Sequence, residues 1–324
     1  MKMGDKIATR VAYGKALLQL GMENPHVMAI DADLACCTMS KDFAGSYPER
    51  FFNAGIAECN MAGMAAGMAS TGKTVFIHSF AMFAAGRAYD QVRNSICYPR
   101  LNVKVVGTHA GLSIGEDGAT HQCLEDLSLM RTIPNMVVVN PCDANETALA
   151  VKAIAEYEGP CYLRLGRLPV ETVTSTPEYD FQLGKGVILR QGEDAAIIAT
   201  GLMVQEALKA ALVLEKEGVN VRVVDMHTIK PLDEELVVRC ARETGAIVTT
   251  EEHNIIGGLG AAVCETVCQS CQVPVVRHGV KDIFGKSGEA GALMKKYHMC
   301  AEDISQCVKE ALGLKMNCVP KEAV

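Results

Sequence analysis

The sequence predicts an α/β protein with two domains, each a mostly parallel sheet flanked by helices. Short runs rich in β-branched residues alternate with longer helical patterns, which is typical of parallel strands covered by crossover helices. A length of 324 residues exceeds what one ordinary core needs. A polar, aperiodic stretch, Glu171–Asp180, interrupts the alternation. We therefore expect a first domain at residues 1–172, a linker at 173–185 and a second domain at 186–315.

Each domain has its own series of predicted elements. In the first domain, the β-branched runs predict strands at Val27–Asp31, Thr74–His78, Val103–Thr108, Met136–Asn140 and Cys161–Leu165. Helical periodicity predicts helices at Ala8–Leu20, Glu58–Ser70, Phe80–Ile96 and Ala144–Tyr157. In the second domain, the predicted strands are Ala195–Thr200, Val221–Asp225, Ala246–Glu251 and Val273–His278. The predicted helices between them are Met203–Lys216, Asp233–Thr244 and Leu259–Cys268.

Composition and charge narrow the range of partners and locations. Hydrophobic residues make up 49% of the chain and charged residues 21%, proportions typical of a globular protein. The net charge of −7, without a basic tract, argues against a nucleic-acid partner. No apolar run approaches the roughly 20 uninterrupted residues that cross a bilayer, and the first residues do not resemble a signal-peptide core. We therefore expect a cytoplasmic protein with no membrane partner.

The cysteines do not indicate a disulfide-rich protein. Fourteen of them are scattered through the chain without the spacing of a disulfide framework. In a chain without a signal peptide we expect reduced thiols. The lone CxxC pair, Cys268 and Cys271, has no second pair with which to bind a metal, and we interpret both residues as structural.

The first segment that indicates chemistry is Asn53–Gly67, in which Glu58 opens a helix made almost wholly of Ala, Gly and Met. A glutamate in the first turn often does no more than complement the helix dipole. Because this helix is apolar on all sides, however, we expect it to be buried. Burial would place the Glu58 carboxyl at a dry boundary, an environment in which carboxyl groups can take up and release protons during catalysis.

The second segment is Gly107–Gln122, a long loop expected after a strand, where α/β folds commonly place functional residues. Two histidines and two carboxylates within this loop suggest a metal site as one interpretation. Their spacing matches no compact metal-ligand pattern, however. Contacts to a polar substrate and the handling of protons fit these residue types better.

Several motifs occur in a fixed order along the chain. Gly-Ile-Ala-Glu-x-x-Met-x-Gly-Met-Ala-x-Gly is followed by Ser-Phe-x-x-Phe and then by Gly-Glu-Asp-Gly-x-Thr-His-Gln. The second half continues with Lys-Pro-Leu-Asp at 230–233, Glu-Glu-His-Asn at 251–254 and Phe-Gly-Lys-Ser-Gly at 284–288. Together they resemble the C-terminal part of a transketolase over nearly the whole chain. The resemblance implies a pyrimidine-binding domain for thiamine diphosphate, followed by a transketolase C-terminal domain.

The resemblance implies cofactor contacts for four residues. Glu58 matches the family's glutamate, which hydrogen-bonds a ring nitrogen of the aminopyrimidine and so activates the cofactor. Phe80 and Phe83, three apart at an expected helix start, match the aromatic pair that forms the pyrimidine pocket. Asp33 matches an aspartate close to the cofactor. Gly86 stands where transketolases often carry a tyrosine, so the pocket wall is expected to differ.

The resemblance also implies a phosphorylated sugar substrate and five residues that contact it. Arg10, His109 and Arg167 match residues that bind the substrate phosphate, a group that favours several charged donors. Asp117 matches a residue that contacts a sugar hydroxyl. His121 matches one that contacts the substrate's oxygens and shares in proton transfer, which makes it, with the glutamate, an expected catalytic residue.

The sequence also departs from the family pattern. Cys37 replaces a serine that contacts the phosphate, so a weaker donor stands there. The Gly-Asp-Gly motif, with which the family holds Mg²⁺ and the cofactor's diphosphate, is absent. The resemblance therefore implies that this chain is the beta, or C-terminal, subunit of a split transketolase. It would be active only with an N-terminal subunit that carries Gly-Asp-Gly and binds Mg²⁺, in an α2β2 heterotetramer.

Three alternatives stay open. A 1-deoxyxylulose-5-phosphate synthase shares Gly-Ile-Ala-Glu and Arg87–Val92, but it is normally one long chain. The beta subunit of a thiamine-dependent 2-oxo acid dehydrogenase has this length, but it lacks Gly-Glu-Asp-Gly-x-Thr-His-Gln in this form. A regulatory or scaffold remnant would have no need to retain Glu58, His109, Asp117 and His121 together.

Overall fold

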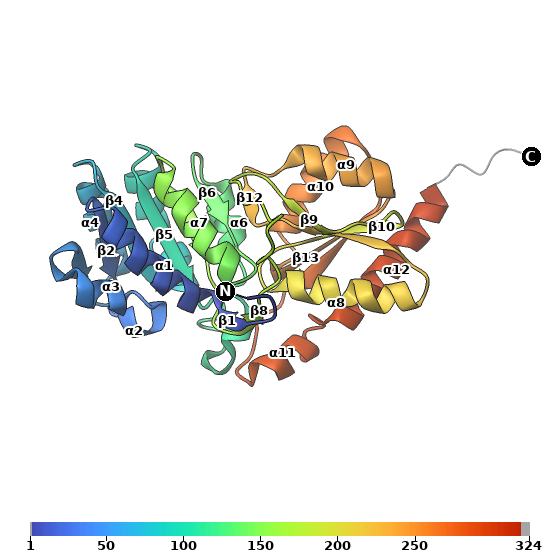
Figure 1. Ribbon diagram of the computed structural model, residues 1–324, viewed down its shortest axis with the longest axis horizontal. Coiled ribbons are helices and arrows are strands. Elements are labelled where there is room, and N and C mark those ends of the chain that lie inside the picture. Colours follow the sequence, from blue (N-terminus) through green and yellow to red (C-terminus); the bar gives the residue numbers. More distant parts are fainter. Residues whose placement is uncertain (1, 319–324) are drawn as a thin grey trace, which may run out of the picture.

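A computed structural model describes residues 2–318 of the chain. Two sheets follow one another along the longest axis of the molecule, with helices on both faces of each (Figure 1). The first sheet has seven strands in the order β12-β6-β7-β5-β4-β2-β3, and the second has five in the order β14-β13-β10-β11-β9. Pairing is parallel except for β12 and β9, which are antiparallel edge strands. The predicted α/β fold with two mostly parallel sheets is confirmed.

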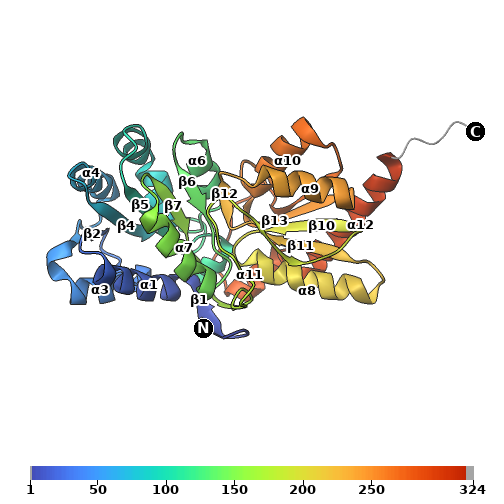
Figure 2. The same ribbon diagram turned by 45° about the horizontal axis from the view of Figure 1, so that its top comes forward.

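The first sheet lies between two layers of helices. Its strands are β2 (Val27–Asp31), β3 (Phe51–Asn53), β4 (Thr74–Phe80), β5 (Val103–Thr108), β6 (Val137–Val139), β7 (Cys161–Arg164) and β12 (Thr228–Lys230). Its α-helices are α1 (Thr9–Glu23), α2 (Ala35–Thr38), α3 (Lys41–Ser46), α4 (Glu58–Ala69), α5 (Tyr89–Gln91), α6 (Asp126–Thr132) and α7 (Ala144–Glu156). Figure 2 shows α1 and α7 on one face and α4 and α6 on the other, and the apolar clusters divide in the same way.

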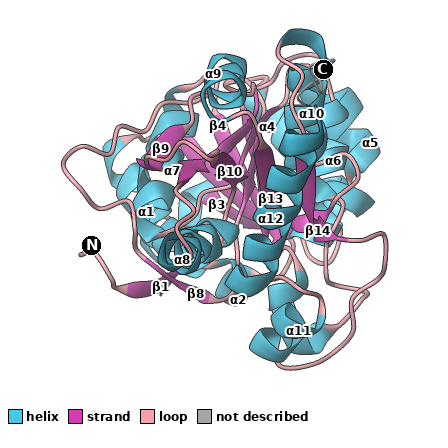
Figure 3. Ribbon diagram, turned by 90° about the vertical axis from the view of Figure 1, so that its right-hand side faces the viewer, coloured by secondary structure: helices cyan, strands magenta, loops and turns pink. Residues whose placement is uncertain are grey.

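The second sheet is built alike, and Figure 3 shows its strands enclosed by helices. Its strands are β9 (Val187–Arg190), β10 (Ala195–Ala199), β11 (Val221–Asp225), β13 (Ile247–Asn254) and β14 (Val275–Val280). Its helices are α8 (Met203–Lys216), α9 (Glu234–Thr244), α10 (Leu259–Ser270), α11 (Ala290–Lys296) and α12 (Ala301–Cys318). Two further short strands, β1 (Lys6–Ala8) and β8 (Pro169–Glu171), pair antiparallel with each other.

The segment expected to be the helix Phe80–Ile96 has a different structure. Strand β4 continues to Phe80, because all seven of its residues are buried within the sheet. The chain then forms two π-helical turns, Met82–Arg87 and Val92–Cys97, separated by α5. The prediction that Phe80 begins a helix is therefore wrong. Such π-turns are rare and often occur at functional sites.

Helix α4 is only partly buried, which corrects the expectation of burial on all sides. Met61 and Ala65 belong to the core, whereas Cys59, Gly63 and Gly67 are exposed. The residues on the exposed face are small, so this face adds little apolar area to the surface. No helix within residues 2–318 has the length and apolar character needed to span a membrane. The cysteines that the structure describes are all free thiols, as expected.

The two domains share a strand and a core, which the sequence did not indicate. Strand β12 comes from the second half of the sequence but pairs with β6 of the first sheet. At its end, the Lys230 ammonium donates hydrogen bonds to the carbonyl oxygens of Arg131 at 2.9 Å and Ile133 at 2.6 Å. One apolar cluster includes Ile30 of the first sheet and Val224 of the second. The domains are therefore joined by continuous packing.

A buried acidic cluster lies where both domains meet the linker. Asp225 ends β11, Glu146 lies in the first turn of α7, and the linker supplies Tyr179, whose hydroxyl donates to both carboxyl groups. The Cys142 thiol donates to Oδ2 of Asp225 at 3.3 Å. Burial raises the pKa of Asp225 to about 7, and the nearby charge of Asp143 acts in the same direction. Burial and the charge of Asp225 also raise the pKa of Glu146 well above its ordinary value.

We predict that this cluster makes stability depend on pH. The folded chain keeps a proton on Asp225 that the unfolded chain releases, so the free energy of unfolding should fall as the pH rises from about 4 to about 7. Asp225→Asn keeps the shape of the side chain but cannot ionise. Urea unfolding at about pH 5 and pH 8 measures this difference. The free energy of unfolding should fall between these two pH values by on the order of 1–3 kcal/mol less in the variant than in the parent chain. Equal losses in both proteins would assign the pH dependence to other groups.

Candidate active site

The candidate site lies at the carboxyl-terminal edge of the first sheet. Phe80 ends β4, His109 follows β5 and Arg167 follows β7. Asp33 follows β2, and Glu58 begins the helix after β3. These five residues are far apart in sequence, but parallel pairing places the ends of their strands along one edge.

Glu58 is buried and paired with a residue that the sequence analysis did not select. Its side chain is 3% exposed, and both carboxylate oxygens accept hydrogen bonds from Nη1 of Arg87 at 2.9 Å. The guanidinium carbon of Arg87 lies 4.4 Å from the centre of the Phe83 ring. Arg87 is four residues beyond Phe83, a spacing that places two helical residues on one face, and this signal could have identified it.

An aromatic cluster continues from Phe83. The Phe80 and Phe83 rings are stacked, with centroids 6.3 Å apart, so the expected pairing of these side chains is present although Phe80 is not helical. His121 packs edge-on against Phe83 at 5.2 Å and lies 6.1 Å from Phe80. His109 lies 4.1 Å from Phe80 on its other side. Contacts therefore run without a break from the Glu58 carboxylate to His109.

His109 ends this run in a cationic environment. It is 4% exposed, adopts a left-handed backbone with φ of 59°, and its Nδ1 lies 2.9 Å from the hydroxyl of Thr108. Burial, followed by the positive charges of Arg10 and Arg167, lowers the pKa of His109 to about 3. The imidazole is therefore neutral at physiological pH and can donate or accept a hydrogen bond.

The two arginines line a cavity of about 540 Å³ that also contains Lys6 and Lys15. Nη1 of Arg10 donates to the carbonyl of Cys37 at 2.7 Å. Arg167 donates to the carbonyl of Ile114 at 2.5 Å, and its Nη2 lies 3.6 Å from exposed Glu116. Burial lowers the pKa of Arg10, and the charge of Arg167 acts in the same direction. Four cations thus line one cavity, and the sequence analysis had selected only the two arginines.

The structure also clarifies the two departures from the family pattern. At position 37 the backbone carbonyl, and not the thiol, contacts Arg10. At Gly86, an added Cβ would lie 2.3 Å from Cε of Met82, so the methionine occupies the space into which a larger side chain would extend. The wall of the expected pyrimidine pocket is therefore formed differently here.

The two aspartates stand apart from the aromatic cluster. Asp33 is exposed in a left-handed conformation with φ of 64°, and it accepts a hydrogen bond from the amide of Asn53 at 2.9 Å. Asp117 is exposed at the end of the 3₁₀ segment Leu112–Asp117, and its carboxylate has no hydrogen bond or ion pair within residues 2–318. Within residues 2–318, no hydrogen bond or ion pair joins either carboxylate to His109 or His121.

The residues beside Glu58 fit an aromatic heterocycle. A cavity of about 650 Å³ is lined by Phe83, Arg87, Met82, Gly86 and exposed Phe284. An aromatic wall next to a buried carboxylate can hold a flat ring and bond one of its nitrogens.

The same edge does not fit Mg²⁺. Within residues 2–318, the one cluster of three metal-ligating side chains is Cys142, Glu146 and Asp225 at the domain junction. Its thiol does not suit a cation that prefers oxygen ligands.

Two family models match the chain: the transketolase pyrimidine-binding domain over residues 5–171 and the transketolase C-terminal domain over residues 184–304. The chain belongs to the transketolase family. It is 48% identical to a putative transketolase C-terminal section of Methanocaldococcus jannaschii over 305 residues, which cover 94% of this chain and 96% of the relative. It is 42% identical to the 6-deoxy-6-sulfo-D-fructose transketolase subunit SqwH of Clostridium sp., covering 94% of this chain and 95% of the subunit.

Solved structures extend the comparison. A split-gene transketolase, described as an inactive beta4 tetramer, superposes with a TM-score of 0.89 at 53% identity, and the match covers 95% of this chain and 99% of that one. By contrast, this chain spans about half of the transketolase of Homo sapiens, 49% of its length at 39% identity. This transketolase chain thus has the extent of a C-terminal section.

We predict that Glu58 and Arg87 are energetically coupled. Arg87→Ala leaves a buried carboxylate without its partner, and because Arg87 is itself 50% exposed, the loss in unfolding free energy should be about 1–2 kcal/mol. Adding Glu58→Gln should recover part of that loss, because a neutral amide needs no counterion. A double-mutant cycle by urea unfolding measures the coupling, with Arg93→Ala, an exposed arginine of the next π-turn, as control. Strictly additive losses would contradict the coupling.

Proposed function

We propose that this chain is the beta subunit of a split, thiamine diphosphate-dependent transketolase that transfers a two-carbon ketol unit between phosphorylated sugars. The observation that carries the proposal is the unbroken run of contacts from Glu58 through the aromatic cluster to His109, whose pKa is lowered by the charges of Arg10 and Arg167. One end of this run suits an aromatic cofactor ring and the other suits an anion. A reacting carbon held between them would lie beside His121.

The first end of the site would hold the cofactor. Thiamine diphosphate supplies the carbanion-stabilising chemistry when it is bound. The Glu58 carboxylate would bond the nitrogen of the aminopyrimidine ring, and Phe80 and Phe83 would hold that ring by stacking. Asp33, exposed beyond β2, would lie close to the cofactor. Nη1 of Arg87 donates to both carboxylate oxygens of Glu58. At least one of these two hydrogen bonds would have to lengthen or break for the ring nitrogen to bond Glu58.

The second end of the site would hold the substrate. Arg10 and Arg167 would bind the terminal phosphate through charge-assisted hydrogen bonds. Neutral His109 would add a donor, and its pKa would rise once a dianion offset the two arginines. His121 would contact the substrate's oxygens and hold or pass on a proton at them. Asp117, whose carboxylate has no hydrogen bond or ion pair within residues 2–318, would accept a hydrogen bond from a sugar hydroxyl.

The remaining half of the enzyme would come from a partner. The sequence has no Gly-Asp-Gly, and the described residues offer no set of oxygen ligands for Mg²⁺ at this edge. An N-terminal subunit would supply Mg²⁺ and the diphosphate contacts, in an α2β2 heterotetramer in the cytoplasm. The pyrimidine-binding domain would end near residue 172, and the C-terminal domain would begin near 186.

The first test is reconstitution. The full chain alone should show no ketol transfer, and activity should appear when it is combined with an N-terminal transketolase subunit, thiamine diphosphate and Mg²⁺. Glu58→Gln should lower turnover in the reconstituted enzyme by about 10²–10⁴ while leaving the chain folded by circular dichroism. Ketol transfer by the chain alone would refute the need for a partner. A folded complex that binds the cofactor but transfers nothing would favour a regulatory role.

The second test concerns the phosphate. Arg10→Ala and Arg167→Ala should each raise KM more than they lower kcat for a ketose phosphate, with a loss in kcat/KM of roughly 10–100-fold. Arg239→Ala, an exposed arginine on α9, is the matched control and should change neither constant. Because one relative is named for a sulfo-sugar, 6-deoxy-6-sulfo-D-fructose should be assayed beside the phosphate and the free sugar. Equal losses for the free and the phosphorylated sugar would show that these arginines do not bind phosphate.

A further inference from the structure

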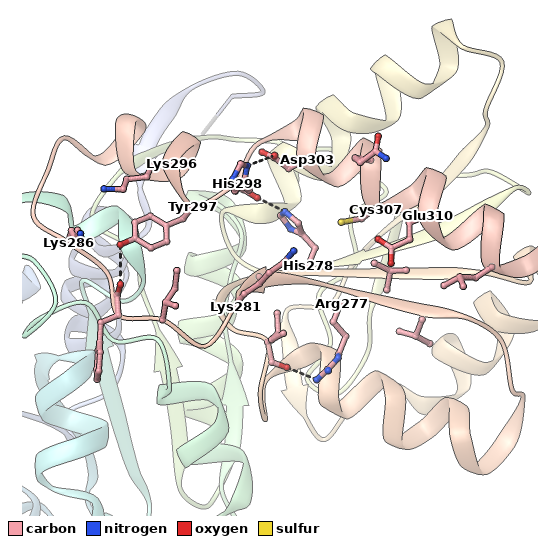
Figure 4. Close-up of a pocket in the computed structure, with 18 residues that line it drawn as sticks. Arg277, His278, Lys281, Lys286, Lys296, Tyr297, His298, Asp303, Cys307 and Glu310 are labelled. Atoms are coloured by element: carbon pink, nitrogen blue, oxygen red, sulfur yellow. Dashed lines mark hydrogen bonds and ion pairs between the residues drawn. The ribbon is translucent and has the colours of Figure 1, made fainter.

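A second cationic cavity lies in the C-terminal domain and shares only Phe284 with the cavities described above. It measures about 930 Å³ and is bounded by strand β14, the loop at 281–286 and the elbow between α11 and α12 (Figure 4). Hydrogen bonds hold its walls together. Nε2 of His278 bonds the carbonyl of His298 at 2.7 Å, and the Tyr297 hydroxyl donates to the carbonyl of Phe284 at 3.0 Å. The elbow is therefore hydrogen-bonded both to β14 and to the loop.

The charge on these walls is positive, although the whole chain carries −7. Four cations line the cavity, Arg277, Lys281, Lys286 and Lys296. None of them forms an ion pair with a carboxylate among the described residues. Among residues 2–318, the acids that line it are Asp303 and Glu310, and Asp303 already accepts hydrogen bonds from the His298 ring at 3.1 Å and from a backbone amide. Arg277 donates to the carbonyl of Ile255 at 2.9 Å, so it keeps its charge but not all of its donors free. The cavity therefore has more positive charge than its two acids can balance, which favours an anion.

The cavity also exposes apolar surface. Phe284 is 83% exposed and Ile283 is 56% exposed, and Val276 adds a half-buried surface from β14. Strand β14 is an edge strand, so its outer backbone groups have no neighbouring strand to bond. A cavity lined by an exposed aromatic ring and by an edge strand suits a planar group that carries polar atoms.

We propose that this cavity binds a phosphorylated compound with a planar apolar part, of the nucleotide class. The phosphates would contact lysines of the cavity wall, and the planar part would lie against Phe284 and the edge of β14. The volume is in the range of about 300–1,000 Å³ that is usual for small-molecule sites. Binding at this site can be measured without turnover, so its test does not require the function proposed above.

The loop that carries Phe284 connects this cavity to the candidate active site. Phe284 also lines the cavity beside Phe83 and Arg87. The Gln122 side chain donates to the carbonyl of Lys286 at 3.0 Å, and Gly118 lies so close to Ser287 that an added Cβ would be 2.3 Å from its hydroxyl. A ligand bound in this cavity would therefore restrict the motion of the loop at 281–286, whose end contacts residues 107–122. Because such coupling is reciprocal, an occupant of the active site would also change the affinity of this cavity.

The test is isothermal titration of the full chain with ATP, inorganic tripolyphosphate and adenosine. ATP should bind more tightly than either of its parts. Lys281→Gln and Lys296→Gln should each weaken ATP binding about three- to tenfold. Lys295→Gln, which removes a neighbouring exposed lysine that does not line the cavity, should leave it unchanged. Phe284→Ala should abolish the preference for ATP over tripolyphosphate.

Other outcomes would overturn the proposal. Equal affinity for tripolyphosphate and ATP in the parent chain would reveal a patch for any polyanion. ATP binding that is lost in Arg10→Ala but kept in both lysine variants would place the nucleotide in the first cationic cavity. The absence of heat and of a shift in melting temperature at millimolar ATP would show that this cavity has no such ligand.

Discussion

Parallel alignment of the strands in the first sheet is the constraint on which the rest of the structure depends. Asp31 pairs with His78 and Phe80 with Thr108, so the strands end together, and the residues that follow them meet at one edge. Because side chains alternate between faces, a slip of one residue would turn Phe80 away from His109. The aromatic cluster and its cationic neighbours exist only in this register. No single residue defines the site, because the sheet brings its parts together.

The electrostatics of the site follow from burial. A buried carboxylate such as Glu58 requires a partner, which Arg87 supplies at the boundary with solvent. His109 meets the same dry environment next to two arginines, so its proton is lost and the imidazole stays neutral. The arginines have few acidic partners nearby, and the unbalanced positive charge faces a cavity. A dianion that enters this cavity would lose its hydrogen bonds to water, and the fixed donors of the arginines would replace them.

The second domain adds Phe284 to the wall of the cofactor cavity and otherwise supports the site through contacts with its loop. Glu252, at the end of the second sheet, accepts hydrogen bonds from the amide of Ser113 at 2.5 Å and from its hydroxyl at 3.3 Å. Burial raises the pKa of Glu252 to about 7. Buried Arg164 bonds Asp126 at 2.7 Å and also the carbonyl of Glu252. These contacts hold the loop 109–122 against the second domain.

The sequence by itself determined the two α/β domains, the order of strands and helices, and the selection of Glu58, Phe83 and Arg10. Alternating periodicities and the order of motifs are properties of the sequence itself, so they can be recognised without a structure. Tertiary structure alone decided that β4 continues through Phe80 and that Arg87 meets Glu58. It also decided that β12 crosses into the first sheet. Each of these depends on which distant surfaces come into contact and exclude water, and neither spacing nor composition encodes such contacts directly.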